Sequence, residues 1–146
     1  MKKSVFFLLL ILLCATNSYS QKLSDTKQII STFFDKYEKK SSADALDFLF
    51  SSNKYIKSEE ISPLKKRIKQ YQGLLGEYSG YELLIKQDVG KSIVVYSYII
   101  KYDRQPLRFI FTFYKANNKW KIFNFMISDE FITEIEKEVI KLSYNK

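Results

Sequence analysis

Residues 92–127 constrain the fold of this chain most, because they read as three consecutive β-strands. The stretch is dense in Val, Ile, Tyr and Phe, and polar turns at 103–106 and 116–119 divide it. A fourth strand at 78–88 precedes it across a turn at 89–90. Short turns join neighbouring antiparallel strands, so we expect a curved four-stranded antiparallel meander.

The asparagines at 117–118 predict the pairing of the last two strands. Asparagine tolerates positive φ, which suits a two-residue hairpin loop. Such a loop sets Phe113 opposite Ile122 and Phe111 opposite Asn124.

The other two turns predict a register in the same way. The turn at 103–106 sets Tyr98 opposite Phe111, and the turn at 89–90 sets Tyr81 opposite Tyr98. Side chains alternate across a strand, so every second residue faces the same side. The predicted inner face is apolar and aromatic, and it comprises Tyr81, Leu83, Ile85, Val94, Tyr96, Tyr98, Ile100, Tyr102, Leu107, Phe109, Phe111, Phe113, Trp120, Ile122, Asn124 and Met126.

The opposite sheet face has an apolar middle and charged margins. Arg108 is expected opposite Lys101, with Glu82 two strands away. Like charges side by side repel unless an anion or a carboxylate intervenes. Either Glu134 of a final helix or an acidic group of a partner protein could supply that carboxylate. We expect Glu82, Lys101 and Arg108 to mark a surface that is covered or that contacts a partner.

Residues 1–20 predict a signal peptide and hence a periplasmic or secreted protein. A basic start precedes an unbroken apolar run at 5–13, and small residues follow at 18–20. The run is shorter than the roughly 20 residues that cross a bilayer, so no stable membrane span is expected. Lipid attachment at Cys14 is disfavoured, because the large Leu13 precedes it.

Residues 21–146 are long enough for one domain with its own core. They contain no cysteine, so no disulfide is expected, and the whole chain lacks histidine. Histidine triads and most zinc sites are thereby excluded, and we expect neither a metal nor a cofactor. The net charge of +8 is spread along the chain, which argues against a nucleic-acid surface.

Helical periodicity predicts three helices before the sheet, at 24–38, 43–50 and 62–72, the last opened by Pro63. The third helix carries a basic cluster, which we interpret as a solvated face or, alternatively, as an anion or headgroup contact. A final amphipathic helix follows the sheet, with a stripe of Phe131, Ile135, Val139 and Leu142. We expect that stripe to dock on the mixed sheet face of its own subunit or of a partner.

The order of three helices followed by a long meander resembles the nuclear transport factor 2-like superfamily, a cone-shaped α+β fold also called cystatin-like. The resemblance covers about residues 24–127, and it includes the aromatic strands, the segment 78–81 and the hairpin 117–121. Family enzymes similar to ketosteroid isomerases and scytalone dehydratase place Asp, His and Tyr inside the cone. This chain has no His and no Asp on its predicted inner face, so those catalytic residues have no counterparts.

A cone of this kind implies an interior that could hold a small apolar molecule. The polar groups expected there, as candidate ligand-binding residues, are Tyr81, Tyr96, Tyr98, Tyr102, Trp120 and Asn124. Asn124 stands out because burying an unpaired amide costs about 1–3 kcal/mol. A tyrosine hydroxyl, a helix-end carbonyl or a ligand would have to bond to it.

Three functions remain open from the sequence. The favoured hypothesis is an exported, non-catalytic module that binds a small apolar ligand in the cone or a partner protein on the mixed face. An isomerase-like or hydratase-like enzyme would use tyrosine with Asp35, Asp44 or Asp47, the carboxylates on helices that could face inward. A structural homodimer is the third.

Overall fold

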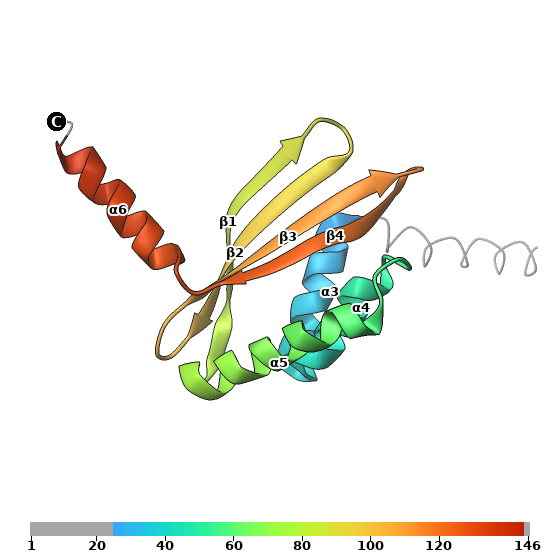
Figure 1. The fold of residues 1–146 in the computed structure, drawn as a ribbon, viewed down its shortest axis with the longest axis horizontal. Coiled ribbons are helices and arrows are strands. Elements are labelled where there is room, and N and C mark those ends of the chain that lie inside the picture. The colour runs from blue at the N-terminus through green and yellow to red at the C-terminus, as the bar shows by residue number, and fades with distance from the viewer. Residues whose placement is uncertain (1–24, 145–146) are drawn as a thin grey trace, which may run out of the picture.

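The computed structural model describes residues 25–144, and its architecture confirms the predicted α+β fold (Figure 1). The predicted signal peptide, including Cys14, lies outside the described residues. The elements are α3 (Thr26–Lys39), α4 (Ser42–Ser51), α5 (Ser58–Leu75), β1 (Tyr78–Val89), β2 (Ile93–Tyr102), β3 (Leu107–Ala116), β4 (Lys119–Ser128) and α6 (Phe131–Tyr144).

The four strands pair in chain order as one antiparallel sheet, β1-β2-β3-β4. Helices α3, α4 and α5 lie together against one face of the sheet, which we call the inner face (Figure 1). The opposite face is called the outer face. Helix α6 leaves the end of β4 and points away from the other helices and from the sheet.

The helix starts follow from their caps, with one correction to the sequence prediction. The Asp25 side chain accepts from the Lys27 N–H at 3.1 Å, as expected for an N-cap. Helix α5, however, begins at Ser58 and not near Pro63. The carboxylate of Glu60 accepts from the Lys57 N–H at 3.0 Å, and an acidic first turn suits the positive end of the helix dipole.

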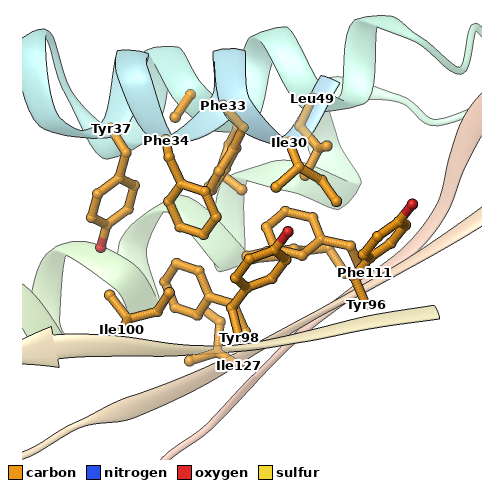
Figure 2. Close-up of a cluster of buried hydrophobic side chains, with 14 of the residues drawn as sticks. Ile30, Phe33, Phe34, Tyr37, Leu49, Tyr96, Tyr98, Ile100, Phe111 and Ile127 are labelled. Atoms are coloured by element: carbon orange, nitrogen blue, oxygen red, sulfur yellow. The ribbon is translucent and has the colours of Figure 1, made fainter. Parts of the chain in front are cut away.

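Helix α3 packs an aromatic stripe into the inner face (Figure 2). Phe33 is fully buried, and its ring lies edge-on to Phe111 with centroids 5.2 Å apart. Phe34 stacks on Tyr81 at 3.7 Å and meets Tyr98 edge-on at 5.3 Å. Edge-to-face and offset pairs add to the burial of apolar area. These rings form the centre of the core.

The hairpin between β3 and β4 forms as predicted, but its register changes after the fourth residue pair from the loop. Residues 117–118 both adopt positive φ, and Phe113 pairs with Ile122. A β-bulge at Phe123 follows, so that Thr112 pairs with Asn124. The predicted pairing of Phe111 with Asn124 is therefore wrong.

The bulge exchanges the two faces of β4 beyond Phe123, because one extra residue reverses the alternation of side chains. Phe125 and Ile127 become buried in the core, while Asn124 and Met126 turn to the outer face. The placement of Asn124 and Met126 on the inner face is thus wrong.

The register of β2 against β3 differs from the prediction by two residues, which preserves the faces. Tyr98 pairs with Phe109 where Phe111 was expected. Pairing with β3 ends at Ile100, because the residues that follow bond to the β1 side, where the backbone N–H of Asp103 donates to the Glu77 carbonyl at 3.1 Å. The end of β2 therefore continues along β1 before it crosses to β3.

The first hairpin also contains a bulge. Tyr81 pairs with Ile100, and a register shift at Leu84 then places Ile85 opposite Ser97 on the outer face. Ile85 was expected on the inner face, and that placement is wrong. The loop spans three residues, with Gly90 at positive φ, and not the two at 89–90.

The bulge in β4 predicts an unequal response to truncation of two neighbouring side chains. We expect Phe125→Ala to lower the free energy of unfolding by about 3 kcal/mol, because it leaves a cavity in the core. Met126→Ala should cost less than about 1 kcal/mol, because half of that side chain is already exposed. Urea denaturation of both variants checks this. The reverse ranking would mean that β4 is regular and that Met126 faces inward.

Candidate functional site

Three of the four tyrosines predicted to line a ligand pocket, Tyr96, Tyr98 and Tyr102, are buried in the packed core, whereas Tyr81 is 40% exposed. The hydroxyls of Tyr96 and Thr26 share a hydrogen bond of 2.8 Å, and both side chains are buried. Tyr98 is wedged among aromatic rings that include Phe34 and Phe111. The structure brings Tyr81, Tyr96 and Tyr98 together, while Tyr102 lies farther along β2 beside Tyr37. Side chains of α3 pack over Tyr96 and Tyr98 (Figure 2).

A small cluster of polar side chains at the far end of β2 contains two further buried hydroxyl groups. Tyr102 and Tyr37 share a buried hydrogen bond between their phenol groups, with the Gln72 side chain within hydrogen-bonding reach of both. Gln72 in turn accepts from the Ser42 hydroxyl at 2.9 Å. The cluster links α3, α4, α5 and β2, so its polar groups bond to each other inside the fold.

Burial raises the pKa of several of these phenols. It raises the pKa of Tyr98 to about 12, with smaller contributions from the neighbouring Tyr96 and Tyr81. Burial also raises the pKa of Tyr37, Tyr78 and Tyr102 above the ordinary tyrosine value. These phenols therefore remain protonated at neutral pH, which suits a structural role in the core.

Trp120 and Asn124, the other two predicted ligand-binding residues, lie at the surface. Trp120 is half-buried under the Lys115 ammonium, 4.9 Å from the ring centroid, beside an open hollow of about 670 Å³. Asn124 lines a second hollow of about 430 Å³ between α5 and β4, together with Phe50 and Phe123. They therefore do not share a site with the buried tyrosines.

The carboxylates that an enzyme could have used face outward. Asp35 forms an ion pair with Lys39, and Asp47 forms one with Lys65 at 2.5 Å. Asp44 is exposed and accepts from the Ser41 hydroxyl at 2.6 Å. The expectation that these carboxylates could face the cone interior is wrong. Within residues 25–144 no group of three or more acidic side chains is placed to hold a metal ion.

The basic cluster of α5 has partners of its own. Lys65 pairs with Asp47, and the Arg67 guanidinium donates to the Tyr71 hydroxyl at 3.1 Å. Lys66 and Lys69 are exposed beside a shallow hollow of about 920 Å³. These contacts and exposures agree with the interpretation of the basic cluster as a solvated helix face.

The outer face of the sheet carries an apolar surface, which we call the outer patch. It comprises Ile85, Ile93, Val95, Ile99, Ile110 and Met126. Ile85 is 60% exposed and Met126 is 50% exposed. A contiguous exposed apolar surface is characteristic of a contact site. The bulge at Leu84 adds Ile85 to this face, and the bulge at Phe123 places Met126 there while Phe125 and Ile127 turn into the core.

The three residues predicted to mark a partner surface lie on this face, although Arg108 and Lys101 are not opposite each other. Arg108 and Glu82 flank Ile99, and Lys101 pairs with Gly80. The two like charges are therefore not directly paired across strands.

The predicted ion pair between Arg108 and the final helix is confirmed. Arg108 Nη2 lies 2.9 Å from Glu134 Oε2, and the guanidinium stacks over the Phe131 ring at 5.7 Å. Phe131 is fully buried. These contacts fix the start of α6 at the edge of the outer face.

Beyond that anchor α6 exposes its apolar side chains. We call Ile132, Ile135, Val139 and Leu142 the α6 stripe. Val139 is 59% exposed and Leu142 is 66% exposed. The helix does not lie on its own outer face (Figure 1), so docking within its own subunit is not what the structure shows. Among the described residues, no helix is both long and apolar enough to span a bilayer.

One signal in the sequence could have indicated which side chains of β4 face outward. In β4 the row of Phe123, Phe125 and Ile127 is more apolar than the alternate row that contains Asn124. That difference indicates which row belongs in the core near the end of the strand.

The raised tyrosine pKa values predict a loss of stability at high pH. A phenol whose pKa is higher in the folded state stabilises that state fully below the unfolded pKa of about 10, and the contribution is lost as pH rises through the folded pKa. For Tyr98 this window runs from pH 10 to about 12. Tyr98→Phe should therefore make the stability fall less steeply above pH 10, by at most about 1.4 kcal/mol per pH unit.

Urea unfolding at several pH values between 8 and 11 checks this slope. Tyr55→Phe is the matched control, because Tyr55 is 70% exposed and should leave the pH slope unchanged. Equal slopes for Tyr98→Phe and the unaltered protein would contradict the assignment.

Comparison with known protein families and with curated proteins finds no match to this chain. The resemblance to the nuclear transport factor 2-like superfamily therefore has no support beyond the α+β arrangement itself.

Proposed function

We propose that this chain is an exported protein-binding module that holds a partner protein chain on its outer patch and α6 stripe. One observation above all supports this function. The same chain leaves an apolar sheet face and an apolar helix face exposed, while the aromatic interior of the fold is closed by its own side chains.

The energetics favour a protein partner over isolated exposure. Removing apolar surface from water contributes about 25 cal/mol per Å², so covering the exposed apolar side chains of the outer patch favours association. Stable protein interfaces bury about 800 Å² per partner. A broad flat sheet face next to a projecting helix fits a large partner surface better than it fits a small molecule.

The packed interior argues against the alternative of a small apolar ligand in the cone. Phe33 and Phe34 occupy the space between α3 and the strands, and the hydroxyls of Tyr96 and Tyr102 already have partners. A ligand there would have to displace these rings from a close-packed core. The sequence of residues 1–20 supports the exported location.

Photo-crosslinking in the producing cell tests the proposal. A benzophenone amino acid at Met126, on the outer patch, should yield a crosslinked protein adduct on irradiation. The same probe at Leu74 is the matched control, because Leu74 is an exposed apolar side chain at the end of α5, away from the outer face. Absence of an adduct at Met126, or equal adducts at both positions, would overturn the proposal.

A further inference from the structure

We propose that the partner is a second copy of this chain, with α6 of each copy lying across the outer patch of the other. This inference rests on the proposed function, because it assigns an occupant to the same surface. The complementary parts are already present in one chain: a sheet face that lacks a helix and a helix that lacks a sheet face.

The anchor of α6 explains why the helix would cross to another copy. Only Asp129 and Glu130 separate the end of β4 from the start of the helix. Burial of Phe131 and the ion pair between Arg108 and Glu134 then set the direction of the helix axis. In that direction α6 leaves its own sheet (Figure 1), and its stripe has no surface of its own protomer to cover.

The dimensions of the two surfaces agree. The helix has 14 residues and is therefore about 21 Å long. Strands of 10 residues, such as β2 and β3, are about 33 Å long. The whole α6 stripe can thus lie on the sheet, in the way that helices cover sheets in two-layer folds.

The charges at the margins also match. At about 100° per residue, Glu136 flanks the α6 stripe on one side, and Glu134, which is already paired with Arg108 of its own chain, flanks it on the other. Lys137 and Lys141 lie on the opposite side of the helix. The acidic margins of the helix therefore face whatever the stripe covers.

The outer patch has the opposite character at its margins. Lys101 and Lys121 border it, in addition to Arg108, whose guanidinium is already paired with Glu134 of its own chain. The two lysines outnumber Glu82 on the same face. Electrostatic complementarity of this kind selects the partner and its register more than it adds affinity. The α6 stripe and the outer patch therefore fit each other in apolar character, in length and in charge.

Two-fold symmetry makes the contact reciprocal and closed. If α6 of one copy covers the patch of its partner, the partner's helix covers the first patch by the same operation. The outer patch and the α6 stripe of both chains are then buried at once, so neither surface is left to bind a third copy. The interface contains two copies of the helix-on-sheet contact.

The first test measures the mass of the assembly. Protein purified from cells that express the full chain should run as a dimer in native mass spectrometry and in light scattering. Ile135→Gln combined with Val139→Gln should raise the dimer dissociation constant at least 100-fold. The control, Thr133→Gln combined with Lys137→Gln, lies on the opposite side of α6 and should leave it unchanged. All four side chains are exposed, so the urea midpoint of the monomer should stay the same in each case.

The second test uses disulfide formation, which the chain permits because its sole cysteine is Cys14. With Cys14→Ser in every protein, a Ser97→Cys protein is mixed under oxidising conditions with a tagged Ile135→Cys protein. Ser97 lies in the middle of the outer face, opposite Ile85 and Ile110. We expect a mixed disulfide between the two chains. Lys137→Cys replaces Ile135→Cys as the control and should give little of it.

The outcomes separate this inference from the proposed function. A dimer with the mixed disulfide supports both. A dimer that lacks this disulfide, or a monomer whose Met126 probe captures a protein of another mass, overturns the exchange of α6 but leaves the binding function standing. A monomer with no adduct at Met126 overturns both.

Discussion

The packing of α3 into the sheet is the constraint on which the rest of the structure depends. Phe33 and Phe34 fill the space above β2 and β3, and each full burial of such a side chain contributes about 1.5–3 kcal/mol. The sheet must therefore present apolar side chains at every position under the helix. Where regular alternation would not do so in β4, the strand changes register, because the bulge at Phe123 brings Phe125 and Ile127 into the core.

The sequence predicted the order and type of the elements because the signals are local. The asparagines at 117–118 adopt the positive φ that their loop requires, and Phe113 pairs with Ile122 as a tight hairpin demands. The bulges could not be predicted from the alternation of side chains along each strand. A bulge depends on the fit of a strand to the helices beneath it, and a contact between the α4–α5 turn and β4 illustrates this. There the Asn53 amide donates to the Ile122 carbonyl at 2.7 Å, immediately before the bulge.

The candidate site shifted for the same reason. Predicting a pocket from the inner face placed Asn124 among the tyrosines, and one extra residue in β4 moved it to the opposite side of the sheet. Of the remaining tyrosines, Tyr81, Tyr96 and Tyr98 do lie together, but α3 fills the volume that a ligand would need beside them. Side-chain volume is not contained in a periodic pattern, so the sequence could not distinguish a filled interior from an open one. By contrast, the ion pair between Arg108 and Glu134 was predictable, since it requires only opposite charges on adjacent elements.

The outer face and α6 carry the apolar side chains that the isolated chain leaves exposed to water. An antiparallel sheet can leave one face to water, but here that face exposes apolar side chains such as Ile85 and Met126. The sheet exposes Ile85 and Met126, and the separate helix α6 exposes Ile135 and Val139. The chain therefore carries two apolar surfaces with a strong tendency to associate. Closed reciprocal contact removes both surfaces from water in a single assembly, whereas docking of an unrelated protein on the sheet alone would leave the helix stripe exposed. This difference is the physical reason to prefer a second copy as the occupant.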